Sequence, residues 1–198
     1  MLSTDGVWAK FKQTDPNSMQ QTQWSNNGSV IWLTGLSASG KSTLAHALQR
    51  ILSQRKMHAY VLDGDNIRCG LSSDLDFSPE GRVENIRRVS EMAALMADAG
   101  VITIVALISP YRIDRGRARK IITDSGSRFI EIYVNAPLSV CEERDPKNLY
   151  KKARAGEIQQ FTGIDAPYEE PENCELILHT NIETIEESIS RIIAGYFP

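Results

Sequence analysis

A glycine-rich segment carries the residue types that bind phosphate. Residues 35–42 read Gly-Leu-Ser-Ala-Ser-Gly-Lys-Ser, which matches the pattern GxxxxGK[ST] in full. The glycines let the backbone curl, so that successive N–H groups and the start of a following helix point at one anion. Lys41 would reach the β- and γ-phosphates, and the Ser42 hydroxyl would bind Mg²⁺. The segment predicts a nucleoside triphosphate site made of Gly35, Leu36, Ser37, Ala38, Ser39, Gly40, Lys41, Ser42 and Thr43.

Two carboxylates, Asp63 and Asp65, follow the second predicted strand. Gly64 between them permits a tight turn that directs both toward one site. Transfer of a phosphoryl group to an alcohol needs a carboxylate near the metal ion, which orients the hydroxyl and takes its proton. Aspartates also commonly cap turns, and the spacing alone leaves both interpretations open. The strings Asn-Lys-x-Asp and Asp-x-x-Gly, typical of GTP switches, do not occur in the chain, which favours a kinase.

Arginines gather after the two aspartates and suggest a second anion site. They are Arg68, Arg82, Arg87 and Arg88. Arg82 and Asn85 are three residues apart on a predicted helix, so they share a face. Arginine forks bind phosphate or sulfate oxygens in bidentate fashion, and an exposed Phe77 would stack on a base. Each of these residues alone also fits a surface charge or a core ring, but together they indicate a nucleotide-like anion as the acceptor.

A further basic run extends from Arg144 to Arg154. In small kinases this position resembles a mobile lid, whose basic side chains close over the triphosphate and exclude water. A solvated helix face is the other interpretation of such a run, and both can hold for different residues. We define the lid segment as about residues 144–168.

The hydrophobic pattern alternates between strands and helices from residue 29 onward. Apolar, β-rich runs predict strands at 30–34, 58–62, 101–108, 129–134 and 176–179. Amphipathic patterns predict helices at 41–54, 79–98, 112–125, 137–155 and 182–196. Strands separated by helices imply a parallel sheet with helices on both faces. Ligands on such sheets bind beyond the carboxyl ends of the strands, which is where the phosphate-binding segment and the aspartates fall.

Length and composition narrow the functional class. The chain has 198 residues and a formal net charge of −3, which suits one domain and argues against nonspecific nucleic-acid binding. Three widely spaced cysteines fit neither a zinc site nor a disulfide framework. The longest apolar stretch, Val101–Ile108, is far shorter than a membrane span. With no signal-peptide pattern at the start, we expect a cytoplasmic protein.

The first 28 residues differ from the rest in composition. They are rich in Gln, Asn, Ser and Thr and close on Asn26-Asn27-Gly28, which predicts a polar extension that ends in a turn. Trp8 and Trp24 suggest that parts of the extension pack on the domain or on a partner subunit. The expected organisation is an extension at 1–28 followed by one domain at 29–198.

Several blocks of sequence together resemble the adenylylsulfate (APS) kinase family. The blocks lie in order between about residues 29 and 175, and the phosphate-binding segment alone would be generic. The more specific ones are Asp63-Gly64-Asp65-Asn66-Ile67-Arg68-Cys69-Gly70-Leu71, Ile108-Ser109-Pro110-Tyr111-Arg112 and Phe161-Thr162-Gly163-Ile164-Asp165-Ala166-Pro167-Tyr168-Glu169. Cys69 departs from the histidine often found at its place in relatives. The resemblance implies a three-layer α/β P-loop kinase fold with a parallel five-stranded sheet and a mobile lid.

The resemblance also implies an activity and its residues. The γ-phosphate of ATP would pass to the ribose 3′-hydroxyl of adenylyl sulfate. The reaction would require Mg²⁺, bound by Ser42 and Asp63. Asp63 is the first candidate for the base, followed by Asp65, while Lys41 acts on the phosphates. Arg144 would stack over the adenine of ATP. The acceptor would be bound by Arg68, Phe77, Arg82, Asn85, Ile108, Ser109, Lys147, Phe161, Gly163 and Ile164, with the two phenylalanines sandwiching its adenine.

Ser109 occupies the position of a family serine described as a phosphoserine intermediate. No His or Lys lies near it in sequence to activate a weak hydroxyl nucleophile, and direct in-line transfer needs no covalent step. A hydroxyl that lines the pocket is the favoured role, and a catalytic one stays open.

Two other functions compete with this interpretation. Another small-molecule kinase, for shikimate or gluconate, would not require the arginine set and two stacking phenylalanines. A noncatalytic module that senses sulfur nucleotides would not require paired aspartates. The resemblance suggests a homodimer and leaves a separate sulfate adenylyltransferase open as a partner, with no nucleic acid or membrane involved.

Overall fold

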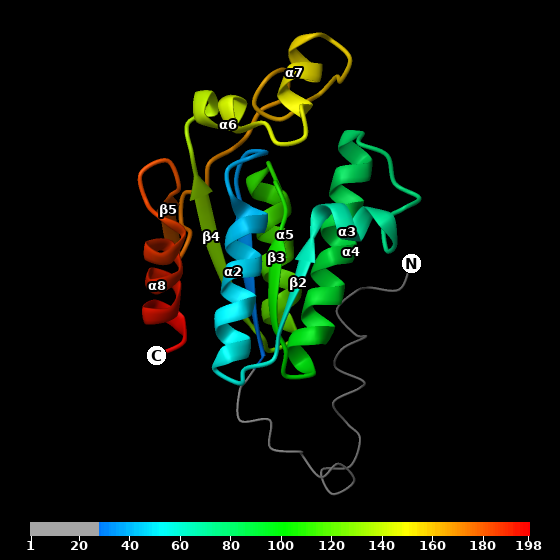
Figure 1. The fold of residues 1–198 in the computed structure, drawn as a ribbon. Helices are drawn as coiled ribbons and strands as arrows, with labels where there is room; N and C mark the ends of the chain where they lie inside the picture. Colours follow the sequence, from blue (N-terminus) through cyan, green and yellow to red (C-terminus); the bar gives the residue numbers. More distant parts are fainter. Residues whose placement is uncertain (1–27) are drawn as a thin grey trace, which may run out of the picture.

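The computed structural model describes residues 28–198, which form one α/β unit (Figure 1). The predicted polar extension, with Trp8 and Trp24, falls almost entirely on residues 1–27, outside the described residues. Its end, Gly28, lies so close to the Ala97 carbonyl oxygen that no side chain would fit there. The division of the chain at residue 28 stays a prediction.

A five-stranded parallel sheet forms the centre of the molecule. Its strands are β1 (Ser29–Thr34), β2 (Ala59–Asp63), β3 (Ile102–Ala106), β4 (Arg128–Asn135) and β5 (Leu176–His179). They are arranged in the order β2-β3-β1-β4-β5, and each neighbouring pair is parallel. The fold predicted from the sequence is confirmed, with β5 at its predicted bounds and the other strands shifted by one or two residues.

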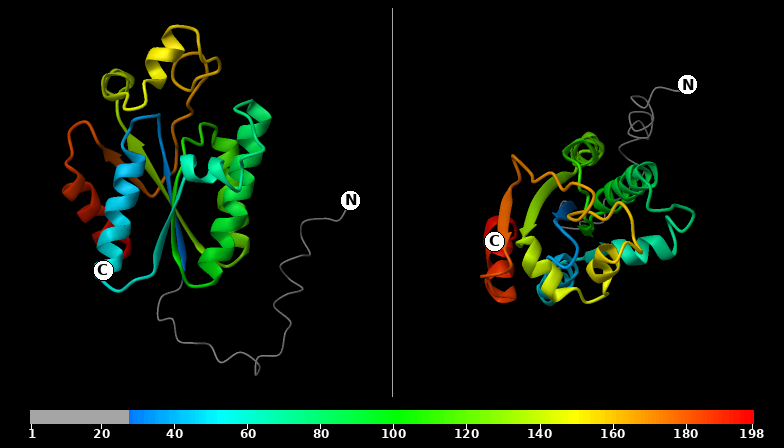
Figure 2. Two further views of the ribbon diagram at one scale, coloured as in Figure 1. Left: turned by 45° about the vertical axis from the view of Figure 1, so that its right-hand side comes forward. Right: turned by 90° about the horizontal axis from the view of Figure 1, so that it is seen from above.

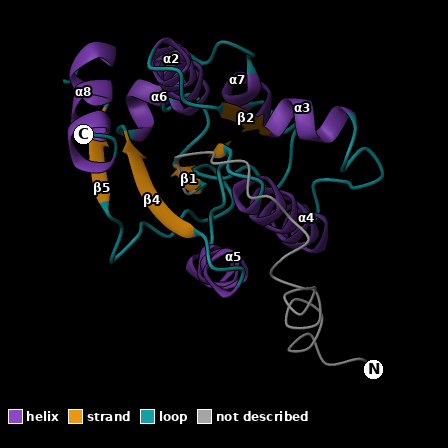
Figure 3. Cartoon of the chain, turned by 90° about the horizontal axis from the view of Figure 1, so that it is seen from below, coloured by secondary structure: helices purple, strands orange, loops and turns teal. Residues whose placement is uncertain are grey.

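Helices cover both faces of the sheet (Figures 2 and 3). One face carries α2 (Lys41–Gln54) and α8 (Ile185–Tyr196), and the other carries α4 (Pro79–Asp98) and α5 (Arg112–Asp124). The short α3 (Gly64–Cys69) follows β2 directly. At the carboxyl ends of the strands, α6 (Leu138–Arg144) and α7 (Leu149–Arg154) stand above the sheet (Figure 1).

Alternation of side chains along the strands builds two cores. In β1, Ile31 and Leu33 pack with α2 and α8, whereas Val30 and Trp32 pack with α4 and α5. All four side chains are fully buried, as expected for a central parallel strand covered on both faces. These two cores hold the five strands together. The candidate functional residues lie at the carboxyl ends of these strands.

The segment between β4 and β5 differs from its prediction. One helix was expected over 137–155, but α6 ends at Arg144 and α7 begins at Leu149. Pro146 cannot donate a helical hydrogen bond, and Asn148 adopts a left-handed φ of 55°. The prediction also missed α3, which Asp63 caps by accepting a hydrogen bond from the Asp65 N–H at 3.0 Å.

None of the helices in residues 28–198 is long and apolar enough to cross a membrane.

Candidate active site

A cavity of about 960 Å³ opens at the carboxyl ends of the strands. Its lining comes from the phosphate-binding loop, α3, the start of α4, the residues after β3, the lid segment and the loop after β5. We call one end the phosphate half; its members include Lys41, Ser42, Asp63, Arg144 and Thr180. We call the other end the arginine half; its members include Arg68, Phe77, Arg82, Asn85, Ser109, Lys147 and Phe161. Residues from six separate parts of the sequence therefore share one cavity.

The phosphate-binding loop connects β1 to α2, as the sequence predicted. Gly35 has a φ of 149° and Gly40 a φ of 104°, and a Cβ at Gly35 would lie 2.4 Å from the Val134 carbonyl oxygen. Glycine is therefore required at the first of these positions for space as well as for conformation. Gly35, Leu36 and Ser39 lie behind the cavity surface, while Ser37, Ala38, Gly40, Lys41, Ser42 and Thr43 line it.

Lys41 is the first residue of α2 and is almost completely buried. Its Nζ donates to the carbonyl oxygens of Gly35 at 3.0 Å and Leu36 at 2.5 Å. Burial lowers the pKa of the Lys41 ammonium group to about 8, and the nearby Asp63 carboxylate opposes this shift. The loop thus holds a lysine whose charge is poorly solvated, so an anion placed beside it would be strongly attracted.

Asp63 caps a helix and also contacts the residue after Lys41 in the phosphate-binding loop. One carboxylate oxygen caps α3, while the other accepts a hydrogen bond from the Ser42 hydroxyl at 2.5 Å. The side chain is buried at the base of the cavity. Asp65, by contrast, has a 69% exposed side chain that pairs with Lys147 of the lid segment.

The donor atoms at Ser42 and Asp63 suit Mg²⁺. No group of three or more His, Cys, Asp or Glu side chains that could hold a metal occurs among residues 28–198. Mg²⁺ is commonly bound by one or two carboxylates with water and substrate phosphates rather than by a full protein cage. One hydroxyl and one carboxylate beside a phosphate-binding loop therefore fit this ion.

Two arginines in the arginine half are held by backbone carbonyls. The Arg82 guanidinium donates to the carbonyl oxygens of Phe77 at 3.0 Å and Gln160 at 2.6 Å, and to the Thr162 hydroxyl at 3.2 Å. The Arg68 guanidinium lies 4.1 Å from the centroid of the Phe77 ring. Burial, together with the nearby Arg82 charge, lowers the pKa of Arg68. An anion between the two arginines would relieve their repulsion.

Asn85 adds a polar atom that lacks a partner. Its side chain is buried, and its Oδ1 accepts no hydrogen bond from any of residues 28–198. A buried amide oxygen without a donor is destabilising, so the position favours a ligand that brings one. Asn85 lines the same cavity as Arg82, which confirms that the two share a face of α4.

The two predicted stacking phenylalanines have different environments. Phe77 is 67% exposed on the loop before α4. Phe161 is buried and packs edge-on against Tyr150 with ring centroids 5.0 Å apart. Both line the arginine half, as does Ile108. The structure thus brings the pair to one cavity, one ring mostly exposed beside the Arg68 guanidinium and one packed in the lid segment.

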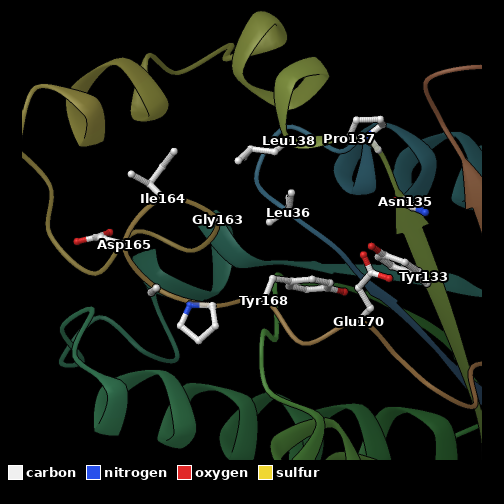
Figure 4. A pocket seen from close by; sticks show the side chains of 13 residues that line it. Leu36, Tyr133, Asn135, Pro137, Leu138, Gly163, Ile164, Asp165, Tyr168 and Glu170 are labelled. Atoms are coloured by element: carbon white, nitrogen blue, oxygen red, sulfur yellow. The ribbon is translucent and has the colours of Figure 1, made fainter.

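Gly163 and Ile164 do not line this cavity. They belong to a neighbouring pocket of about 580 Å³ on the other side of the phosphate-binding loop, with Leu36 and Tyr133 (Figure 4). Ile164 packs with the lid helices and Leu36 in a small apolar cluster that also contains Phe161. A direct role of Gly163 and Ile164 in acceptor binding stays a prediction.

Ser109 is a constrained residue whose hydroxyl has only neutral partners among residues 28–198. Its hydroxyl accepts a hydrogen bond from Trp32 Nε1 at 3.0 Å and lies 3.4 Å from the Leu107 carbonyl oxygen. Its φ is 40°, and its own carbonyl oxygen accepts from the buried Arg115 guanidinium at 2.7 Å. The geometry gives the hydroxyl no base, which favours the lining role over that of a nucleophile.

Sequence reasoning missed Thr180, which links several parts of the phosphate half. Arg144 donates to the Thr180 carbonyl oxygen at 2.6 Å, and the Thr180 hydroxyl donates to the Ser39 carbonyl oxygen at 2.7 Å. A lone threonine in a loop after a strand carries no pattern by which the sequence would single it out. Trp32 was missed for a similar reason, because its apolar strand predicts only core packing.

Comparisons with known proteins agree on one family. The model of the family described as Adenylylsulphate kinase matches residues 27–179. An adenylyl-sulfate kinase of Saccharomyces cerevisiae is 59% identical over 94% of this chain and 91% of its own. One of Clostridium acetobutylicum is 51% identical over 96% of this chain and 93% of its own. The solved structure of the Mycobacterium tuberculosis APS kinase in complex with AMPPNP and APS has a TM-score of 0.83 and 48% identity, over 85% of this chain and 97% of that one.

Proposed function

The chain belongs to the adenylylsulphate kinase family, and we propose how its cavity performs that family's reaction. The enzyme transfers the γ-phosphate of ATP to the 3′-hydroxyl of adenylyl sulfate, giving 3′-phosphoadenylyl sulfate and ADP in sulfate assimilation. The observation that carries the assignment of halves is that Asp63 lines one cavity together with the phosphate-binding loop and a pair of arginines. ATP would occupy the phosphate half and adenylyl sulfate the arginine half.

The phosphate half orients the donor. Backbone N–H groups of the loop and the Lys41 ammonium group would bind the β- and γ-phosphates, where negative charge develops during transfer. Ser42 and Asp63 would hold Mg²⁺, which would neutralise negative charge on the phosphates. Arg144 would lie over the adenine of ATP, supported by its place beside Thr180 at the edge of the cavity.

Asp63 is the proposed base. The 3′-hydroxyl oxygen forms a bond to the γ-phosphorus, the bond from that phosphorus to the β,γ-bridging oxygen breaks, and the hydroxyl proton passes to the Asp63 carboxylate. Its burial next to Ser42 supports this choice, because the carboxylate is close to where the γ-phosphate must lie. Asp65 is more exposed and already paired with Lys147, which supports a role in holding the lid segment over the acceptor.

The arginine half recognises the acceptor. Arg68 and Arg82 would bind its phosphosulfate group, and the unpaired Asn85 amide oxygen would accept a hydrogen bond from it. Phe77 and Phe161 would enclose its adenine, with Ile108, Ser109 and Lys147 completing the wall. We propose that Ser109 stays unmodified, since Trp32 already binds its hydroxyl. Ile164 would act on this wall through the cluster that it shares with Phe161, and Gly163 lies against Leu36 and Leu138 of the same cluster.

The assembly and setting of the enzyme are part of the proposal. We propose a homodimer in the cytoplasm that receives adenylyl sulfate from a sulfate adenylyltransferase on a separate chain. Mass measurement of the native protein in solution tests the dimer, and a single-chain mass would contradict it.

The reaction is tested by mixing the purified protein with ATP, Mg²⁺ and adenylyl sulfate. ADP release is followed against a sample without adenylyl sulfate, and the second product is identified by mass. We expect ADP formation that depends on the acceptor, together with 3′-phosphoadenylyl sulfate. ADP formed equally in both samples would indicate an ATPase, and saturable binding without ADP would indicate a sensor of sulfur nucleotides.

A further inference from the structure

Thr180, in the loop after β5, touches three parts of the phosphate half at once. Its hydroxyl donates to the Ser39 carbonyl oxygen at 2.7 Å, on the phosphate-binding loop. Its backbone N–H donates to the Asn135 carbonyl oxygen at 3.0 Å, at the end of β4. Its carbonyl oxygen accepts from Arg144 Nη2 at 2.6 Å, where the lid segment begins. One residue therefore connects the sheet, the phosphate-binding loop and the lid.

Arg144 has few other partners that would set its position. Its Nη1 lies 3.4 Å from both the Ala38 carbonyl oxygen and the Thr180 hydroxyl oxygen. These are long contacts, so the short bond to the Thr180 carbonyl is the strongest of the three. The side chain is otherwise exposed at the rim of the cavity. Where the Arg144 guanidinium stands is thus decided mainly by where Thr180 stands.

We propose that Thr180 is a positioning residue for nucleotide binding: its hydroxyl fixes the β5–α8 loop to the phosphate-binding loop, and its carbonyl fixes Arg144 above the site. This inference rests on the proposed function, in which ATP occupies the phosphate half. Without the hydroxyl bond, the Thr180 carbonyl and the Arg144 guanidinium would still be paired. The position of this pair relative to the phosphate-binding loop would no longer be fixed. The adenine of ATP, under Arg144, and its phosphates, on the phosphate-binding loop, would then be held by two segments that move separately.

The methyl group of Thr180 supports the same geometry. A Cβ built at Gly40 would lie 3.7 Å from the Thr180 Cγ2, so the methyl group stands over this glycine of the loop. A β-branched side chain has few χ1 rotamers, which keeps the hydroxyl directed at Ser39. Serine would keep the hydrogen bond and lose the methyl contact, while valine would keep the shape and lose the hydrogen bond.

The first test compares Thr180→Val with Thr180→Ser. The measured quantity is the dissociation constant of a nonhydrolysable ATP analogue with Mg²⁺, in the absence of adenylyl sulfate. Loss of one hydrogen bond predicts about 3- to 10-fold weaker binding for Thr180→Val. The KM for adenylyl sulfate should be unchanged, and Thr180→Ser, which keeps the hydrogen bond and loses only the methyl contact, should bind the analogue more tightly than Thr180→Val does. Equal binding by the valine and serine variants would overturn the proposal.

A double-mutant cycle with Arg144→Ala separates positioning from a general loss of structure. If Thr180 acts through Arg144, the combined variant should bind the analogue more tightly than the product of the two single effects predicts. Fully multiplicative effects would overturn the proposal, even if Thr180→Val proved less stable. Acceptor-dependent ADP formation by the unaltered protein is measured alongside. Its absence would reject the proposed function, whereas nucleotide binding reports on Thr180 by itself.

Discussion

The two halves of the cavity are built in different ways. The phosphate half is built around two buried side chains, Lys41 at the start of α2 and Asp63 at the end of β2, with the exposed Arg144 at its rim. The arginine half consists of long or exposed side chains that are held by loop carbonyls and by the lid segment, as Arg82 and Phe77 show. The buried centre of the first half follows the carboxyl ends of β1 and β2 and the loop between β1 and α2, whereas the second depends more on α3, α4 and the lid segment.

This difference has a functional consequence. Under the proposed function, the buried Lys41 and Asp63 would hold the transferred phosphate in place, and the lid segment would close over the acceptor as it binds. Changes in the phosphate half should therefore act on turnover or on nucleotide binding, and changes in the arginine half on the KM for adenylyl sulfate. Variants in each half test whether this separation holds.

The largest effect is expected for Asp63→Asn. Asparagine still caps α3, so the fold should be kept, and the phosphate-binding loop and Lys41 should still bind the nucleotide, so that binding falls much less than turnover even though Mg²⁺ loses a charged ligand. Turnover should fall on the order of 10²- to 10⁴-fold, the range for loss of a general base. The measurement is kcat together with the dissociation constant of a nonhydrolysable ATP analogue. Asp65→Asn is the matched control and should act mainly on the KM for adenylyl sulfate. The reverse pattern would make Asp65 the base.

The next effect is expected for Arg82→Lys. A lysine ammonium group cannot reach the carbonyls of Phe77 and Gln160 and the Thr162 hydroxyl from one planar fork. The KM for adenylyl sulfate should rise about 10- to 100-fold, as expected for charge-assisted hydrogen bonds, while binding of the ATP analogue stays constant.

Arg87→Lys is the control for this prediction. Arg87 is on the same helix but pairs with Glu84 on the surface, outside the cavity. Because exposed ion pairs contribute little, Arg87→Lys should change neither constant. An equal effect of the two variants would mean that α4 contributes only charge, not a shaped site.

The two phenylalanines give a third and smaller contrast. Phe77→Leu should leave the thermal midpoint of unfolding unchanged, because the ring is mostly exposed. It should raise the KM for adenylyl sulfate about tenfold, through loss of stacking on the adenine. Phe161→Leu should raise the same KM and also lower the midpoint, because Phe161 packs against Tyr150 in the lid cluster. Identical midpoints would show that the lid is not anchored through Phe161.

How much of each half can be predicted from the sequence depends on how far apart in the sequence its contacting residues lie. The phosphate-binding loop is a local pattern between a strand and a helix, so its residues and α2 were predicted at their observed bounds. Asp63 was found because it ends a strand. The Trp32–Ser109 bond joins residues 77 apart, and the Thr180–Ser39 bond joins residues 141 apart. No local pattern encodes such pairs, and only the order of strands in the sheet brings them together.

The lid segment shows a second limit of sequence patterns. Residues 137–155, which extend into it, were predicted as one amphipathic helix, yet the chain breaks between α6 and α7. That break places Lys147 against Asp65 of α3, across the cavity. In a helix that continued through residue 147, Lys147 would belong to the helix and not to the loop that reaches Asp65. The break between α6 and α7 therefore explains both the error in the predicted helix and the unexpected contact with α3.

The smallest effect is a pH dependence that belongs to the phosphate half alone. Burial lowers the pKa of Lys41 to about 8 in the free enzyme, and bound phosphates raise it again by stabilising the charged form. Nucleotide binding therefore takes up a proton above this pKa, and affinity falls as pH rises. Binding of the ATP analogue should be about fourfold weaker at about pH 8.5 than at about pH 7, as the protonated fraction of Lys41 falls.

Lys41→Arg is the control for the pH dependence. Its guanidinium stays protonated over this range, so analogue binding should be weaker in absolute terms but independent of pH. Binding of adenylyl sulfate should not share the Lys41 dependence, because its two arginines remain charged throughout. If Lys41→Arg showed the same slope as the unaltered protein, another group would titrate, and the burial of Lys41 would not be what distinguishes the two halves.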